Sequence, residues 1–267
     1  MRDHAQPSSS LRGLRALITR PEPSNRALAD AVERRDGEAV CLPAIETEPV
    51  DRPALVGQLA QTRDVGLVIF VSVPAVAHGS CLLTENHVRG RQVAAIGSAT
   101  AKALASRGIR VDITPENDTY TTEALLGHPA LAHPEDQSEV LIVRGVGGRE
   151  LLASTLGERG FDVRYAQAYV RRRPGPERAV AARAAIRSAG APHIITATSL
   201  EILDNTLLLL GAEADLVRSS SHVIAPSRRI AQAAMSVAGF KLPPLTSRGA
   251  DNEALLSAME AWWGSRR

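Results

Sequence analysis

An internal repeat constrains the fold of this chain more than any other feature of its sequence. The segment that starts at Arg15, RALITRPEPSNRALADAVERRDGEAV, resembles the one that starts at Glu139, EVLIVRGVGGRELLASTLGERGFDV. A second pair follows, because GLVIFVSVPAV resembles HIITATSLEIL and AIGSATAKALASRGI resembles IAPSRRIAQAAMSVAGF. The order along the chain is therefore A, B, A′, B′. Two similar domains explain this order more simply than one sheet of unusual width.

Within each repeat, short apolar runs alternate with amphipathic segments. The runs predict strands at residues 14–18, 38–42, 65–71, 93–96, 140–143, 193–196 and 223–225. Helices are predicted from Ser24, which we expect to act as an N-cap, and over residues 98–107 (ended by Gly108), 148–160 and 251–263. Such alternation is typical of parallel sheets covered by helices on both faces. The predicted fold class is α/β, with two similar doubly wound parallel-sheet domains.

Two extended stretches connect the repeated blocks. Residues 44–50 (AIETEPV) and 164–172 (RYAQAYVRR) alternate as strands do, and they flank the block between them. A block that is entered by one strand and left by another suggests a two-stranded antiparallel linker. We therefore predict a discontinuous first domain (1–44 plus 173–267), a second domain (51–163) and linker strands at 44–50 and 164–172.

Composition excludes several classes of protein. The 267 residues carry a net charge of only +2, with both signs mixed, whereas a nucleic-acid binder would show a basic stripe. The first ten residues are polar, and no apolar run approaches the length of a membrane span. We expect a cytoplasmic protein that binds neither nucleic acid nor membrane.

Hydroxyl, glycine and arginine residues follow the predicted strands. In open parallel sheets ligands bind at the carboxyl ends of the strands, where free N–H groups at helix N-termini favour anions. The candidate binding residues are Arg20, Ser72, Gly97, Ser98, Thr100, Arg144, Gly145, Thr196, Thr198, Ser199 and Ser227. For any single Ser or Thr an ordinary N-cap is the alternative interpretation. The whole set, present in both halves, favours a cleft that binds a polyanion.

Motifs for metal, nucleotide or hydrolase chemistry are missing from the sequence. RGVGG at Arg144 is not GxGxxG, and no GxxxxGK[ST] loop occurs. The seven His residues have no metal-ligand spacing, and IGSAT around Ser98 is not GxSxG. We therefore expect no metal and no cofactor.

Ten short elements in a fixed order carry a resemblance to a known family. They are LITRP, CLPAIE, FVSVPAV, AIGSATAKAL, YTTEALL, VLIVRGVGGRELL, AYVRR, ITATS, APSRRIAQ and the closing EALL. From Arg15 to about Ala261 the sequence resembles the uroporphyrinogen-III synthase family. No element is a sharp motif alone, so the ordered set is the evidence.

The resemblance implies a fold and an activity. It implies that repeat A joins B′ in one domain, that B joins A′ in the other, and that the active site lies in the cleft between them. It further implies a cofactor-independent hydro-lyase, which closes the linear tetrapyrrole hydroxymethylbilane to uroporphyrinogen III with inversion of the last pyrrole. We expect the protein to be a monomer. Transient hand-over from hydroxymethylbilane synthase is the one protein partner that the resemblance suggests.

The resemblance also implies a catalytic residue. Tyr169 in AYVRR matches the family tyrosine that faces the cleft, and its phenol is the candidate acid for the departing hydroxyl. Tyr165 has the same alternation phase and competes for this role, and packing of Tyr169 within the linker strand is the plainer alternative. The chain departs from some members at Pro74 and at Ser227-Arg228-Arg229.

Two other classes remain open at this point. One is a hinged α/β module that binds a tetrapyrrole or another anion without turning it over. The other is a glycosyltransferase-like enzyme, for which a clearer carboxylate constellation for a nucleotide is expected.

Overall fold

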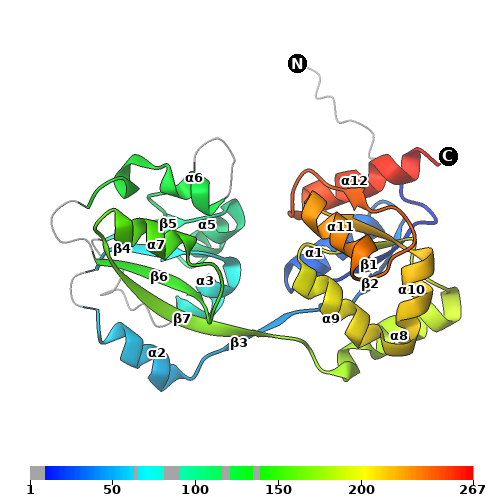
Figure 1. Cartoon of the computed structure of the whole chain (residues 1–267), viewed down its shortest axis with the longest axis horizontal. Helices are drawn as coiled ribbons and strands as arrows, with labels where there is room; N and C mark the ends of the chain where they lie inside the picture. Colours follow the sequence, from blue (N-terminus) through cyan, green and yellow to red (C-terminus); the bar gives the residue numbers. More distant parts are fainter. Residues whose placement is uncertain (1–9, 63–64, 81–90, 116–120, 135–138, 267) are drawn as a thin grey trace, which may run out of the picture. The chain divides into compact units, whose positions relative to one another are not determined.

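The chain forms two units, each built around its own mainly parallel sheet (Figure 1). This computed structural model describes residues 10–62, 65–80, 91–115, 121–134 and 139–266. Unit 1 comprises the described residues of Met1–Glu46 and Arg172–Arg267, and unit 2 those of Thr47–Arg171. Both boundaries fall within the ranges that the sequence predicts as linkers, 44–50 and 164–172.

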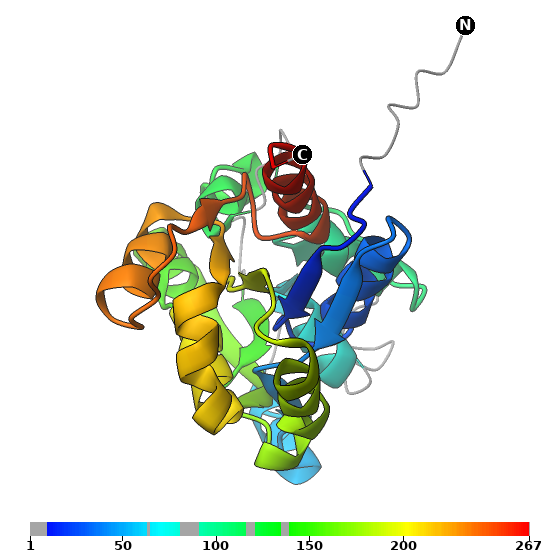
Figure 2. The same cartoon turned by 90° about the vertical axis from the view of Figure 1, so that its right-hand side faces the viewer.

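Unit 1 contains a five-stranded sheet in the order β10-β9-β8-β1-β2, with parallel pairing throughout. The strands are β1 Arg15–Ile18, β2 Glu38–Cys41, β8 Ile194–Thr196, β9 His222–Ala225 and β10 Leu245–Thr246. Helices α1 (Ser24–Glu33) and α12 (Asn252–Gly264) cover one face. The other face is covered by α8 Val180–Ala189, α9 Leu200–Leu210, α10 Ala214–Ser220 and α11 Arg228–Ser236. In Figure 2, where unit 1 faces the viewer, the yellow and orange helices and blue α1 lie on opposite sides of its strands.

Unit 2 has a five-stranded sheet in the order β3-β7-β6-β4-β5. Its strands are β3 Glu46–Pro49, β4 Val65–Phe70, β5 Gln92–Ala95, β6 Glu139–Gly145 and β7 Asp162–Arg172. One face is covered by α2 Arg52–Leu59, α3 Val73–Gly79 and α5 Ser98–Ala105. The other is covered by α6 Thr122–Leu126 and α7 Leu151–Glu158. Helices on both faces make each sheet doubly wound, which confirms the predicted fold class.

The sequence repeat reappears as a structural repeat. In sheet order, β9-β8-β1-β2 of unit 1 corresponds to β5-β4-β6-β7 of unit 2. Repeat A thus joins B′ and repeat B joins A′, as the resemblance implies. Even the short β10 has a counterpart, because Ile113 forms a parallel bridge with Ala94 of β5. After each of these edge segments a capped helix follows, α12 with Asp251 as its cap and α6 with Thr121.

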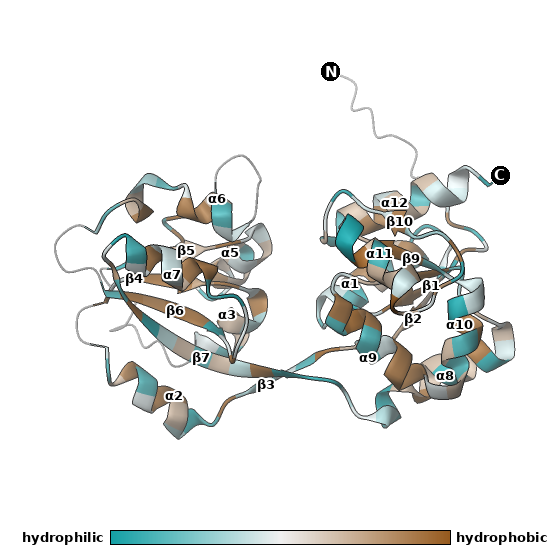
Figure 3. Ribbon diagram, viewed as in Figure 1, coloured by the Kyte–Doolittle hydropathy of each residue, from teal (hydrophilic) through white to brown (hydrophobic). Residues whose placement is uncertain are grey.

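The linker strands differ from the prediction in one respect. They are hydrogen-bonded neighbours, as a two-stranded linker requires, but both also belong to the sheet of unit 2, with β7 beside β6 and β3 at the edge beyond it. The reason is the length of β7, whose 11 residues allow it to pair with β6 before the chain returns to unit 1. In Figure 3, β6 is brown along most of its length, whereas β7 is mostly pale or teal. This difference follows from burial of β6 in the middle of the sheet.

The predicted cap of the first helix is wrong. Ser24 is the first helical residue of α1, and the N-cap position is taken by Pro23, which has a helical conformation and makes no side-chain cap hydrogen bond. Instead, the N–H of Asn25 donates to the carbonyl of Pro21, so that the turn itself leads into the helix. The Asn25 side-chain amide, which is buried, donates to the carbonyls of Ile18 and Arg20 and fixes the end of β1.

Candidate functional site

A cavity of about 430 Å³ opens at the carboxyl edge of the unit 2 sheet. The connections after β4 and β6 pass to opposite faces of that sheet, so the strand order reverses between these two neighbours. Doubly wound folds bind ligands at such a switch point. The lining residues are Val71, Ser72, Ile96, Thr121, Thr122, Glu123, Ile142, Arg144, Gly145, Gly147, Gly148, Arg149, Leu152, Ala153, Tyr169 and Arg171.

Tyr169 is held against the floor of this cavity. Its side chain is only 6% exposed, and its hydroxyl lies 3.1 Å from the hydroxyl of Ser72. The ring passes directly over Gly145, where an added Cβ would lie 2.8 Å from two ring carbons. Glycine at this position is therefore what allows the phenol to reach Ser72.

Tyr165 does not share the environment of Tyr169. Arg144 pairs with Gln167 but Gly145 pairs with Tyr169, so β7 contains one extra residue, Ala168, at this point. Such a bulge shifts the alternation of side chains by one position. Tyr165 consequently packs with the α6 and α7 face, while Tyr169 packs with the α2, α3 and α5 face. The prediction that the two tyrosines share one phase is wrong for this reason, and only Tyr169 lines the cavity.

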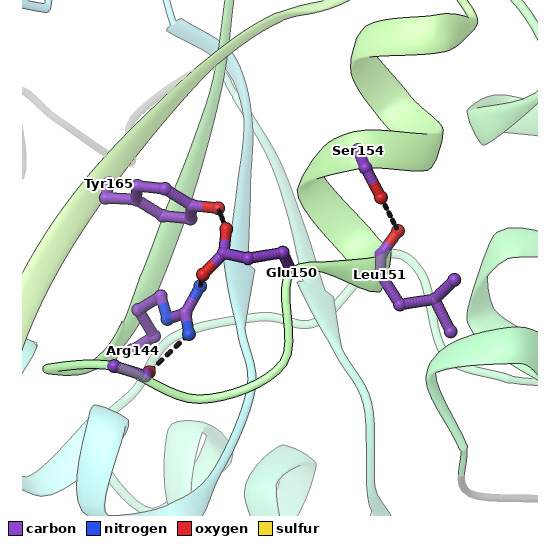
Figure 4. A network of polar contacts seen from close by, with 6 residues as sticks. Arg144, Glu150, Leu151, Ser154 and Tyr165 are labelled. Carbon is purple, nitrogen blue, oxygen red and sulfur yellow. Dashed lines mark hydrogen bonds and ion pairs between the residues drawn. The ribbon is translucent and has the colours of Figure 1, made fainter.

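A polar network ties Tyr165 to the loop that follows β6 (Figure 4). Its hydroxyl donates to the carboxylate of Glu150, and the Arg144 guanidinium lies over its ring, 4.8 Å from the centroid. Arg144 also pairs with Glu150 at 3.0 Å and donates to the carbonyl of Gly147. The hydrogen bond from Tyr165, with the nearby Arg144 charge, lowers the pKa of the Glu150 carboxyl. Burial, followed by the bond to Glu150, raises the pKa of Tyr165.

This network assigns Arg144 a supporting role. The residue is 6% exposed and its guanidinium already has a carboxylate, a carbonyl and a ring as partners. These contacts shape the loop from Gly145 to Glu150. Arg144 also lines the cavity, and its contact with a ligand stays a prediction. Gly147 and Gly148, both at positive φ, give that loop its turn.

Two exposed arginines supply the positive charge that the cavity presents. Arg149 and Arg171 line it, and neither forms an ion pair with another residue of the described chain. Sequence reasoning missed both. Arg171 follows Tyr169 by two positions in AYVRR, so strand alternation was the available signal. For Arg149, the signal was its place between the glycine turn and the start of α7.

Ser72 combines two contacts. It is the N-cap of α3, and its hydroxyl accepts from the N–H of Ala75 at 3.2 Å while contacting Tyr169. Pro74 occupies the first turn of the same helix and has no N–H, so this turn offers one donor fewer to a ligand. Within repeat B, Gly97 is the N-cap of α5, Ser98 is its first residue and Thr100 is buried in it. None of these three lines the cavity.

The remaining predicted residues belong to unit 1. Thr196 is fully buried, and its hydroxyl accepts from the N–H of Thr19 at 3.0 Å. The Thr19 hydroxyl donates in turn to the carbonyl of Thr196, so the pair joins the ends of β1 and β8. A supporting role fits Thr196 better than the predicted ligand contact. Ser199 and Ser227 are the N-caps of α9 and α11, and Thr198 precedes the first of them, half-buried.

Arg20 lies at the carboxyl end of β1. Its guanidinium donates to the side-chain oxygen of Asn252 at 2.7 Å, and in the described structure its Nε is buried without a hydrogen-bond partner. Burial lowers the pKa of Arg20, an effect that the nearby Asp251 opposes. A buried guanidinium N–H of this kind favours an additional acceptor.

Comparison with known proteins decides the family. A family model described as uroporphyrinogen-III synthase HemD matches residues 26–257. The chain belongs to this family. The resemblance inferred from the ordered motifs is thereby confirmed.

Curated relatives carry the same name. The chain is 37% identical over 160 residues to the uroporphyrinogen-III synthase of Salmonella typhimurium, and 33% identical over 159 residues to that of Escherichia coli. Each match covers 58% of this chain and 64% of the relative's own length. The chain thus spans a little under two thirds of the curated relatives it matches.

Solved structures of the family share the fold. A mutant uroporphyrinogen III synthase from Thermus thermophilus matches 95% of this chain and 100% of its own, with a TM-score of 0.57 at 19% identity. The enzyme from Helicobacter pylori covers 93% of this chain and 99% of its own, with a TM-score of 0.55 at 15% identity. At these identities the likeness concerns the fold alone.

The described residues contain neither a helix that could span a membrane nor a cluster of metal-ligating side chains. None of the helices described is long and apolar enough to cross a membrane. Within the same residues, no group of three or more His, Cys, Asp or Glu side chains is arranged to hold a metal ion.

Proposed function

We propose that this protein is a uroporphyrinogen-III synthase, which converts hydroxymethylbilane to uroporphyrinogen III with loss of water and inversion of the last pyrrole. The single observation that carries the proposal is the cavity of unit 2 in a chain of this family: the phenol of Tyr169 lines it together with two arginines that have no ion-pair partner among the described residues. The geometry offers an acid beside an anion site, which is what the reaction needs from a protein.

Binding of the substrate is proposed to rest on its acetate and propionate groups. Arg149 and Arg171 provide charge, and the loop through Gly147 and Gly148 leads to the first turn of α7, whose N–H groups have no partner within the helix. Charge-assisted hydrogen bonds to carboxylates are stronger than neutral ones. In unit 1, the buried Nε of Arg20 supports a further carboxylate contact. The implied location of the substrate between the two units stays a prediction.

Tyr169 is proposed to assist departure of the terminal hydroxyl. The C–O bond breaks with both electrons going to oxygen, and the pyrrole nitrogen supplies density to the carbon left behind. The phenol proton completes a water molecule with the departing oxygen. The substituted carbon of the last pyrrole then attacks, giving a spiro intermediate. Its bond to the bridging carbon of the third pyrrole breaks, the last ring turns over, and the free α-carbon of that ring attacks the bridging carbon to close the macrocycle. The proton released when the ring regains aromaticity restores the phenol, so the net change is loss of one water.

Positioning of the substrate is proposed to account for the rest of the rate enhancement. Holding the two ends of the linear tetrapyrrole together can lower the barrier by several kcal/mol, to which one positioned acid adds roughly 10²-fold. We further propose that the reaction needs no metal or cofactor, and that a cytoplasmic monomer receives its substrate from hydroxymethylbilane synthase. Rapid hand-over would leave the free substrate little time to close without the enzyme, a side reaction that gives the type I isomer.

The test adds purified protein to freshly generated hydroxymethylbilane and resolves the type I and type III products by chromatography. We expect the type III isomer without added metal or nucleotide, and an unchanged rate after treatment with a chelator. Only type I product, formed at the rate seen without protein, would contradict the proposal. Tight binding of the product without any turnover would instead identify a tetrapyrrole-binding module.

A further inference from the structure

The hydroxyl of Ser72 contacts two groups at once. It accepts from the N–H of Ala75 at 3.2 Å and lies 3.1 Å from the hydroxyl of Tyr169. The backbone of Ser72 is extended, as an N-cap requires, so the first contact fixes where its oxygen lies. Within the part of the chain that is described, Ser72 is the only hydrogen-bond partner of the Tyr169 hydroxyl.

The surroundings leave the phenol little freedom. The Tyr169 ring rests on Gly145, whose missing side chain makes room for it, and the residue is 6% exposed. The ring of His78 lies 5.8 Å from the Tyr169 ring, and burial lowers the pKa of this histidine, which favours its neutral form. Packing thus sets the plane of the ring, while Ser72 lies where it can set the direction of the O–H bond.

The number of hydroxyl protons fixes the direction of the hydrogen bond between Ser72 and Tyr169. A serine hydroxyl has one proton, and a tyrosine hydroxyl has one as well. When Tyr169 donates its proton to the departing oxygen, its own oxygen can only accept from Ser72. The bonds then run from the Ala75 N–H to Ser72, from Ser72 to Tyr169, and from Tyr169 to the substrate. Hydrogen bonds in such a chain polarise one another, which makes the last donor stronger.

We propose that Ser72 is the positioning residue for the catalytic phenol: it orients the Tyr169 hydroxyl and donates to its oxygen as the proton leaves. The inference rests on the proposed function and replaces the expectation that Ser72 contacts the substrate itself. Ser72 forms and breaks no covalent bond. Its effect falls on the rate of hydroxyl departure and leaves binding of the carboxylates unchanged.

The test is a double-mutant cycle on type III formation with Ser72→Ala, Tyr169→Phe and the double variant. We expect Ser72→Ala to lower kcat about 3- to 10-fold with KM unchanged, as for the loss of one hydrogen bond. In the Tyr169→Phe background, where no phenol remains to be oriented, Ser72→Ala should lower kcat less than twofold. Ser72→Thr retains the hydroxyl and should recover most of the rate.

Loss of the helix cap needs a separate control. Ser72→Gly removes the hydroxyl but costs an N-cap little, so it keeps α3 stable should Ser72→Ala unfold. It is expected to lower kcat as Ser72→Ala does. Ser199→Ala removes the corresponding cap of α9, where the hydroxyl accepts from Ile202 at 3.1 Å, and calibrates the change in melting temperature for a lost cap.

Three results would overturn the inference. One is that Ser72→Ala lowers kcat by the same factor in the Tyr169→Phe background as in the wild-type protein. The second is a raised KM with kcat unchanged, which would make Ser72 a substrate contact. The third is wild-type kcat in Ser72→Gly. Failure of the proposed function is distinguishable, because then the wild-type protein itself would form no type III isomer.

Discussion

The carboxyl edges of the two sheets share a topology and differ in chemistry. In unit 1 the ends of β1 and β8 are joined by the buried pair Thr19 and Thr196, and Ile45 packs into the core. By strand register, Ile18 pairs with Cys41 as Ile142 pairs with Tyr165, so Ile45 follows Cys41 in the sequence by the same four positions as Tyr169 follows Tyr165.

The arginines at the ends of β1 and β6 show the same divergence. Arg20 of unit 1 reaches across to Asn252 of α12, while Arg144 of unit 2 binds within its own loop and lies over Tyr165. The loop that Arg144 shapes borders the cavity that contains Tyr169. A duplicated fold therefore supplies two equivalent edges whose side chains differ: one borders the cavity that Tyr169 lines, and at the other the buried pair Thr19 and Thr196 joins two strand ends.

The largest expected effect comes from closing the space beneath the phenol. Gly145→Ala places a methyl group 2.8 Å from the Tyr169 ring, so the ring must move away from Ser72. We expect a loss of type III formation of about 100-fold, the contribution of one positioned acid. The measurement is kcat, with circular dichroism to establish that the variant is folded.

Gly157→Ala is the matched control for that variant. It lies on α7, and an added Cβ there meets no atom within 4 Å. It should retain the wild-type kcat and gain up to about 1 kcal/mol in stability. A folded Gly145→Ala variant with wild-type kcat would show that the ring position does not matter.

A substitution at the carboxyl edge of the unit 1 sheet should lower stability and leave the catalytic rate nearly unchanged. Thr19→Val removes a buried hydroxyl and leaves the carbonyl of Thr196 without this donor. We expect the free energy of unfolding to fall by about 1–3 kcal/mol, with kcat within about twofold of wild type. Urea unfolding and the isomer assay measure the two effects. A tenfold lower kcat with an unchanged free energy of unfolding would contradict the assignment of a stabilising role to Thr19 at the unit 1 edge.

A smaller effect is expected when the pH is lowered. Burial, followed by the charges of Arg15 and Arg266, lowers the pKa of His193, whose Nδ1 accepts from the N–H of Arg15 at 3.0 Å. Because the folded state then binds the proton more weakly than the unfolded state, the stabilising contribution of His193 is complete above its ordinary pKa of about 6.5. It declines as the pH falls through the lowered pKa.

Tryptophan fluorescence can follow this decline in unit 1, because both tryptophans of the chain, Trp262 and Trp263, lie on α12. The urea midpoint should fall between pH 8 and pH 5. In His193→Asn, whose amide oxygen can still accept from Arg15, the fall should be smaller. An equal fall in both proteins would assign the pH dependence to other groups.

Much of the fold was predictable because it depends on local patterns. Apolar runs located β1, β4 and β6 to within two residues, and the repeat predicted which halves join. The two-residue strand β10 gave no signal, since its pairing with β9 is tertiary. The cap at Ser24 failed because the backbone of Pro23 is already helical, which the sequence pattern does not reveal.

The candidate site was predictable only in part. Carboxyl ends of strands gave Ser72, Arg144 and Gly145, and the family motif gave Tyr169. The bulge that separates the faces of Tyr165 and Tyr169 depends on the register between β6 and β7, so counting along one strand cannot find it. Likewise, the burial of Thr196 arises from its partner Thr19, which lies 177 residues away in the sequence.

The most direct test of the central claim compares Tyr169→Phe with Tyr165→Phe in the rate of type III formation. The two phenols lie on opposite faces of one sheet, and only Tyr169 lines the cavity. Tyr169→Phe should lower kcat by roughly 10- to 100-fold with the fold intact, as for removal of a general acid. Tyr165→Phe, which loosens the loop at Glu150, should stay within about threefold of wild type. A wild-type rate for Tyr169→Phe, or a larger loss for Tyr165→Phe, would contradict the account.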